Sequence, residues 1–151
     1  KENPVSGNFT LSIIPLSLIY AVVLLITASA AGALLVMTNI TAVPAKINAV
    51  RRLLPLYLAV SILTGYREEL FFRHYLITEL GKNIKNFYPV IISSLMFAAC
   101  HIYQGTAGII ISFLTSIMLS VIFLRHKNIH INALSHTAFN FCILASAVFS
   151  S

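Results

Sequence analysis

Long apolar blocks alternate with short polar segments along most of this chain of 151 residues. A helix needs about 20 apolar residues to cross the hydrocarbon core of a bilayer. Helices satisfy their own backbone hydrogen bonds in lipid, and the residue alternation of a transmembrane β-barrel is absent from this sequence. The pattern therefore predicts an all-α, multi-pass transmembrane helix bundle of about five membrane segments, at 11–37, 53–80, 87–104, 107–124 and 129–149.

The segment 53–80 differs from the others because only its first half is apolar, and 53–63 is too short to span a membrane alone. Pro55 is tolerated in a first helical turn, and a single interior glycine such as Gly65 weakens a helix but rarely ends one. We therefore predict one long helix whose second half is amphipathic. Gly81 is its expected C-cap.

The chain has no internal repeat and no low-complexity linker, so 1–151 is predicted to be a single membrane-embedded domain in which 1–10 is a polar tail. Residues 11–37 are too long for a signal-peptide core and are interpreted as a retained span. The connections 38–52, 81–86 and 125–128 are all basic. These three connections lie on one face of the membrane if the segment 53–80 turns back or stops part-way. They lie on two faces if this segment crosses the membrane fully. Basic faces are expected to be cytoplasmic.

Composition supports a membrane protein, because 58% of the residues are hydrophobic and only 9% are charged, against about 25% in a typical soluble domain. The net charge of +6 comes from cations that mainly lie between the apolar blocks. Such flanking cations suit membrane anchoring, and the absence of a basic helix with interleaved aromatic residues excludes nucleic acid as a partner. Cys100 and Cys142 lie in apolar blocks without a CxxC pattern and are expected to be small buried apolar side chains.

Ionisable side chains within membrane segments are costly and usually functional. Glu69 and Arg73 have the spacing of an ion pair on one helix face, whereas Glu68 points about 100° away and is free to face a cavity. A charge cluster at a membrane interface is the alternative explanation. His101, one turn after Phe97, is by itself more typical of a hydrogen-bonded structural histidine.

His136 and Asn140 share one face of an apolar helix, because they are four residues apart. Hydrogen bonding between helices is an equally good explanation for this pair alone. The remaining ionisable residues within or at the ends of the apolar segments are expected to be solvated or interfacial: His74, Glu79, His126 and His130.

Three motifs stand in order on successive apolar segments: Glu68-Glu69-x-x-x-Arg73, Phe97-x-x-x-His101 and His136-x-x-x-Asn140. Together they resemble the CAAX protease and bacteriocin-processing family, also called the Abi family, of intramembrane endopeptidases. Its eukaryotic relative is the Ras-converting CAAX endopeptidase. The resemblance covers 53–150, with 11–37 as a preceding span. It implies peptide-bond hydrolysis near the membrane boundary, at a polar active site inside the bundle.

The resemblance also implies roles for the site residues. Glu68 would be the general base that activates water, His101 would hold or polarise that water, and His136 with Asn140 would stabilise the oxyanion. Glu69, Arg73 and Phe97 would support them. The residue types suit this chemistry, because burial moves the pKa of a carboxyl group towards working pH and because His and Asn can donate to an oxyanion.

Other reaction types are limited by the residues present. The chain has no Asp for a Ser-His-Asp triad and no H-E-x-x-H zinc signature. Glu68, His101 and His136 could still form a His₂Glu zinc site; the interpretation favoured here is a metal-free glutamate mechanism with no cofactor.

Two other classes compete with a protease. One is a non-proteolytic membrane immunity or binding protein of the same fold. The other is a small transporter, which is disfavoured because paired Gly/Pro-interrupted segments are absent. As partners we expect membrane lipid and a membrane-associated peptide or protein, such as a prenylated tail or a bacteriocin-like peptide. The expected location is a bacterial cell membrane.

Overall fold

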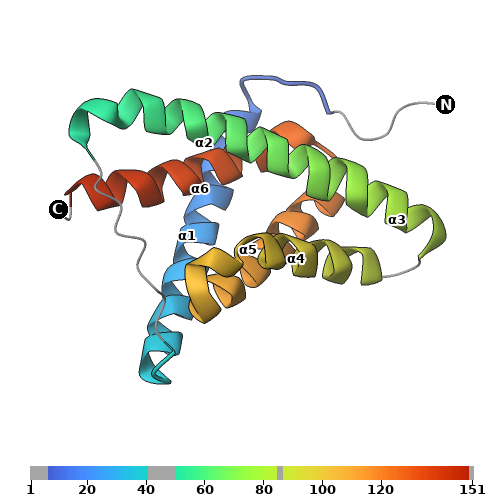
Figure 1. Cartoon of the computed structure of the whole chain (residues 1–151). Coiled ribbons are helices and arrows are strands. Elements are labelled where there is room, and N and C mark those ends of the chain that lie inside the picture. The colour runs from blue at the N-terminus through green and yellow to red at the C-terminus, as the bar shows by residue number, and fades with distance from the viewer. Residues whose placement is uncertain (1–6, 41–49, 85–86, 150–151) are drawn as a thin grey trace.

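The computed structural model describes residues 7–40, 50–84 and 87–149, and these ranges contain helices and connecting turns but no strand (Figure 1). The predicted all-α class is therefore confirmed. The α-helices are α1 (Ile13–Met37), α2 (Leu54–Glu69), α3 (Thr78–Asn83), α4 (Tyr88–Cys100), α5 (Gly105–His126) and α6 (Ile129–Phe149). Short 3₁₀ turns at Arg51–Leu53 and Ile102–Gln104 precede α2 and α5, and a π-helical stretch, Leu70–Ile77, joins α2 to α3.

Three of these helices are long and apolar enough to cross a membrane among the residues described, namely α1, α5 with its preceding turn, and α6. The apolar helix α4 has only 13 residues. The remaining long helix is formed by α2, the π-helical stretch and α3, and it owes its lower hydropathy to the charged residues of its second half. The charged side chains of this second half place polar groups inside the bundle.

The long helix predicted at 53–80 is confirmed, since the chain stays helical from Leu54 to Asn83 with Pro55 in its first turn. The expected C-cap at Gly81 is wrong. The helix continues to Asn83, and Ile84 then takes an extended conformation with φ −114° and ψ 122°. A Cβ atom at Gly81 would meet nothing within 4 Å, so no tight turn needs a glycine there.

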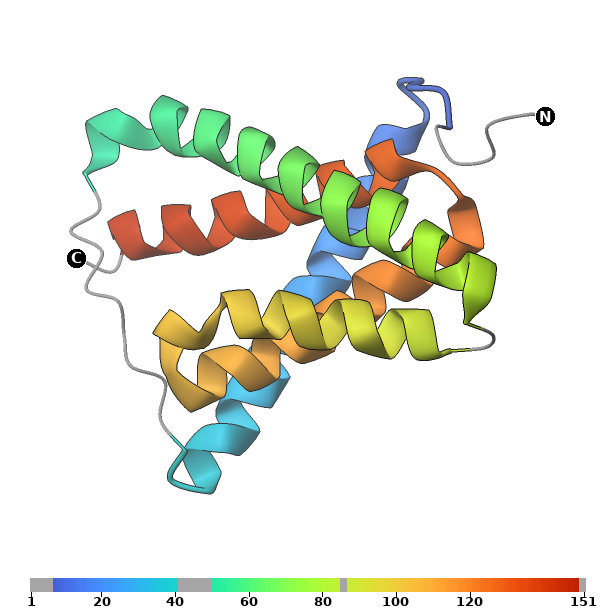
Figure 2. The ribbon, with the colours of Figure 1, turned by 45° about the vertical axis from the view of Figure 1, so that its right-hand side comes forward.

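Helices α2 and α6 run side by side in opposite directions, while α4 packs on α5 and α1 crosses both α5 and α6 (Figures 1 and 2). The guanidinium of Arg51, just before α2, lies 5.5 Å from the ring centroid of Phe149 at the end of α6. The end of α3 and the start of α6 lie at the opposite end of this helix pair (Figure 2). Basic residues therefore occur at both ends, which contradicts the alternative in which 53–80 turns back. Two residues of the basic connections, Lys46 and Lys85, lie outside the described residues, as do residues 1–6 of the predicted tail.

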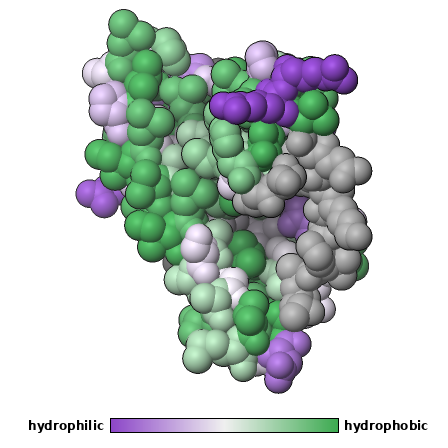
Figure 3. All heavy atoms as spheres, turned by 90° about the vertical axis from the view of Figure 1, so that its left-hand side faces the viewer, coloured by the Kyte–Doolittle hydropathy of each residue, from purple (hydrophilic) through white to green (hydrophobic). Residues whose placement is uncertain are grey.

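The surface of the bundle is apolar and much of its interior is polar. Apolar residues cover much of the face in Figure 3, and the exposed residues include Leu18, Ile26 and Leu63. Cys100 and Cys142 are exposed too, which corrects their predicted burial. The prediction failed because an apolar block in a membrane protein covers the outside of its helices as well as their packed faces. Buried positions are instead rich in polar side chains, such as Ser61, Ser93, Ser94, Ser116, Asn132 and Thr137.

Gly65 allows α2 and α6 to approach closely. A Cβ atom at this position would lie 2.6 Å from Thr137 Oγ1 and 3.0 Å from the carbonyl oxygen of Ala133. Small residues at such contacts are typical of helix pairs in membranes. Glu69 lies one turn further along α2, so this contact brings its carboxylate up against α6.

Candidate active site

A buried ion pair forms the centre of the polar interior. Arg73 Nη1 lies 2.9 Å from Glu69 Oε1, and both side chains are fully buried, which confirms the predicted pairing on one helix face. Arg73 Nη2 also donates to the carbonyl oxygen of Ser116 at 3.0 Å and to its Oγ at 2.8 Å. The ion pair therefore connects the long helix to α5.

Glu69 stands at the junction where α2 passes into the π-helical stretch that contains Arg73. Single π-helical turns within α-helices occur frequently at functional sites. Ser93 on α4 donates its hydroxyl to the carbonyl oxygen of Phe72 at 2.9 Å, so a side chain from another helix satisfies one backbone group of this stretch. The sequence pattern predicted a helix here but gave no sign of the π-helical geometry.

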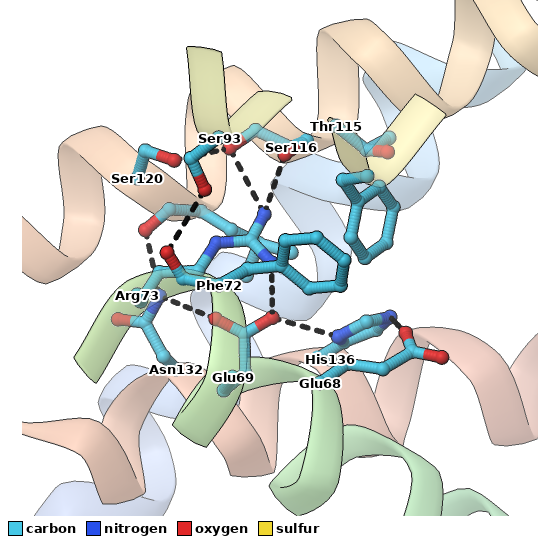
Figure 4. A network of polar contacts seen from close by, with 12 residues as sticks. Glu68, Glu69, Phe72, Arg73, Ser93, Thr115, Ser116, Ser120, Asn132 and His136 are labelled. Carbon is cyan, nitrogen blue, oxygen red and sulfur yellow. Dashed lines mark hydrogen bonds and ion pairs between the residues drawn. The ribbon is translucent and has the colours of Figure 1, made fainter. Parts of the chain in front are cut away.

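Two side chains of α6 also bind Glu69 (Figure 4). His136 Nδ1 lies 2.8 Å from Glu69 Oε1 and Asn132 Nδ2 lies 3.1 Å from Glu69 Oε2. A carboxylate can only accept, so Nδ1 of His136 carries the proton in this contact. Sequence reasoning missed Asn132, although its position four residues before His136 places it on the same helix face.

Glu68 lies at the margin of this network rather than inside it. Its Oε2 is 3.7 Å from His136 Nε2, its Oε1 is 3.3 Å from Arg67 Nη2, and its side chain is 14% exposed. The predicted difference between the two adjacent glutamates is confirmed, because Glu69 is buried in an ion pair while Glu68 remains accessible. The imidazole of His136 is thus placed between two carboxylates, with one ring nitrogen towards each.

His101 is joined to this centre through Phe97. Its Nδ1 lies 2.8 Å from the carbonyl oxygen of Phe97, and the two rings stack with centroids 4.5 Å apart. The ring centroid of Phe97 in turn lies 5.9 Å from that of His136 and 4.9 Å from the guanidinium carbon of Arg73. Donation from Nδ1 to the carbonyl leaves Nε2 of His101 as a free acceptor.

The structure brings most of the predicted site residues together, namely Glu68, Glu69, Arg73, Phe97 and His136, with His101 beside Phe97. Asn140 stands one turn beyond His136 on α6 and is partly buried. No hydrogen bond joins Asn140 to another of these site residues within the described ranges. Its position agrees with the predicted shared helix face, while its role stays a prediction.

The four ionisable residues predicted to be solvated or interfacial differ from one another. Glu79 is exposed and forms an ion pair with Lys82 at 2.7 Å. His126 and His130 are partly buried and pair with the hydroxyls of Tyr20 and Tyr66 at 2.7 Å and 3.1 Å. His74 is partly buried, and its Nδ1 is buried with no partner among the described residues.

Of the three residues considered for a zinc site, Glu68 and His136 lie close together, with Oε2 and Nε2 3.7 Å apart. Within the ranges that the structure describes, no three His, Cys, Asp or Glu side chains converge as metal ligands. His136 Nδ1 is bound by Glu69, and His101 stacks on Phe97.

Long apolar helices around a buried carboxylate–histidine–arginine centre are the features of a helical membrane protein with a polar interior. Residues 50–142 match a family model described as Type II CAAX prenyl endopeptidase Rce1-like. The chain belongs to this family of CAAX-type endopeptidases, and all three motifs lie within the matched residues. Comparison with curated proteins and with solved structures gave no match.

Proposed function

We propose that the chain is a multi-pass intramembrane endopeptidase of a bacterial cell membrane, which hydrolyses a peptide bond near the membrane boundary with water activated by Glu68. The observation that carries this proposal is the placement of Glu68 Oε2 3.7 Å from His136 Nε2. One group is a partly exposed carboxylate, and the other is a ring nitrogen held in place by the buried Glu69. A base and a potential donor therefore face the same accessible point.

The reaction follows from these positions. Glu68 takes a proton from a water molecule whose oxygen attacks the carbonyl carbon of the substrate, and the carbonyl oxygen becomes an oxyanion. His136 takes part in this step with protons on both ring nitrogens: Nδ1 keeps the proton that it donates to Glu69, and Nε2, which is unprotonated in the neutral ring, carries the second proton and donates a hydrogen bond to the oxyanion. The Asn140 amide supplies a second donor. The free Nε2 of His101 accepts a hydrogen bond from the water. When the intermediate collapses, the C–N bond breaks and Glu68 passes its proton to the leaving amine.

Family membership and the apolar surface support a proposal for the substrate class. We propose a membrane-associated peptide or protein, such as a prenylated tail or a bacteriocin-like peptide. The test is cleavage of a panel of such peptides by the purified protein in detergent, with Glu68→Ala as the inactive control. Cleavage by neither protein would favour a non-proteolytic immunity or binding protein of the same fold, whereas equal cleavage by both would show that Glu68 is not the base.

Metal removal should leave the activity intact. Because Glu68 acts on water directly in this mechanism, dialysis against a strong chelator is expected to change kcat by less than about twofold, well below the effect of losing one catalytic donor. The measurement is the cleavage rate together with the metal content of the same sample. Stoichiometric zinc, with activity lost on removal and regained on return of the metal, would establish the His₂Glu zinc alternative.

Asn140→Ala should lower kcat by about 10²–10³, as is typical when one oxyanion donor is lost, while KM and melting temperature change little. The reason is that Asn140, as proposed, bonds strongly only to the transition state. Both quantities are measured on one preparation. A helix-packing role predicts the reverse, namely a large fall in melting temperature with normal turnover per folded molecule.

A further inference from the structure

Asn132 lies behind the candidate active site and is completely buried. Its Nδ2 donates to Glu69 Oε2 at 3.1 Å and to the carbonyl oxygen of Leu119 on α5 at 2.6 Å. The amide orientation is determined by these contacts, since a flipped amide would turn Oδ1 towards a carboxylate and a carbonyl. The side chain is therefore a fixed donor aimed at Glu69.

The two oxygens of Glu69 are held differently. Oε1 accepts from Arg73 Nη1 at 2.9 Å and from His136 Nδ1 at 2.8 Å. Oε2 accepts from Asn132, and no other donor to it occurs among the described residues. Without Asn132, this oxygen would be buried without a partner, and the carboxylate could rotate to share Arg73 and His136 between its two oxygens. A buried acceptor that loses its partner costs about 1–3 kcal/mol, and more if it is charged, so rotation would be favoured.

Rotation of the Glu69 carboxylate would change the orientation and the tautomer of the His136 imidazole. The ring is kept in one orientation and with Nδ1 protonated by its contact with Oε1, which turns Nε2 towards Glu68. A second partner that fixes a functional histidine in this way is a recurring device in enzyme sites. Asn132 and His136 lie one helical turn apart on α6, so the same helix supplies both the imidazole and the group that fixes its carboxylate partner.

We propose that Asn132 is a positioning residue for the reaction: through Glu69 it fixes the tautomer and orientation of His136. Its hydrogen bonds among the described residues are to Glu69 and Leu119 and not to Glu68, so we assign it a role through Glu69. The proposal rests on the proposed function for its effect on rate, but its effect on the His136 ring is independent of any activity.

The experiment compares Asn132→Ala with Ser135→Ala. Ser135 is a matched control, because it is also completely buried on α6 but its hydroxyl donates only within the helix, to the carbonyl oxygen of Ile131 at 2.7 Å. Asn132→Leu is the second variant, which fills the buried volume without restoring the donor. Each protein is assayed for kcat and KM and, with ¹⁵N-labelled histidine, for the tautomer of neutral His136; a His136→Gln sample assigns the signal.

For both Asn132 variants we expect kcat to fall by about 10–100-fold, the size seen when a partner behind a metal-bound histidine is lost, with KM nearly unchanged. The His136 signal should change from a ring protonated at Nδ1 to a mixture of tautomers. Ser135→Ala should change neither quantity. A wild-type tautomer in a folded Asn132 variant would overturn the proposal, as would a signal change of equal size in Ser135→Ala. If the wild-type protein cleaves nothing while the tautomer still depends on Asn132, the proposed function fails and the positioning role stands.

Discussion

Glu68→Gln should reduce peptide cleavage by about 10⁴, at the upper end of what a general base contributes, without unfolding the protein. The amide keeps the shape of the carboxylate but cannot take a proton from water. Among the described residues the neighbouring carboxylate cannot replace it, because Glu69 is fully buried in its ion pair. Folding should be preserved because Glu68 is partly exposed and its ion-pair partner Arg67 has 75% of its side chain exposed. Because Arg67 is exposed to solvent, this pair is expected to contribute little, about 0–1 kcal/mol.

The measurement is kcat from single-turnover cleavage together with the melting temperature of the same preparation. Glu79→Gln is the matched control, because Glu79 lies on the same long helix and also pairs with a surface cation, Lys82. It should retain full activity. Turnover close to that of the wild-type protein in folded Glu68→Gln would remove Glu68 from the role of base.

The local part of the site could be predicted from the sequence, because it depends on helical geometry alone. The spacing of Glu69 and Arg73 gives an ion pair on any regular helix, and the phase difference gives Glu68 a different environment. The apolar blocks likewise predicted the helices, whose ends differ from the expected ones by a few residues. Gly81 was assigned wrongly, because a glycine near the end of a helical pattern marks a cap only if the turn requires a left-handed conformation.

The parts that could not be predicted depend on how the helices pack. Glu69 and His136 are 67 residues apart in the chain, so their contact follows from the close approach of α2 and α6 at Gly65, which no periodicity encodes. Asn132 could have been included in the candidate site because it shares a helix face with His136. Its partner Glu69, however, could be identified only when the two helices were placed side by side.

Arg73→Leu should destabilise the protein by about 3–5 kcal/mol, the usual result of removing one partner from a buried ion pair. The substitution leaves the Glu69 carboxylate fully buried without its guanidinium, and it takes away the donor to the carbonyl and hydroxyl oxygens of Ser116. His136 remains 2.8 Å from Glu69, but a single imidazole cannot replace the hydrogen bonds that Arg73 makes to two helices.

The free energy of unfolding in detergent measures this loss, and Lys82→Leu is the matched control. Lys82 forms the same kind of ion pair with Glu79, but the two side chains are 60% and 46% exposed, so its loss should cost about 0–1 kcal/mol. Replacing Glu69 and Arg73 together by leucine should restore part of the stability, because no buried charge is then left unpaired. An Arg73→Leu protein no less stable than Lys82→Leu would show that Glu69 does not depend on Arg73 for its charge, and that the polar centre is more hydrated than its complete burial indicates.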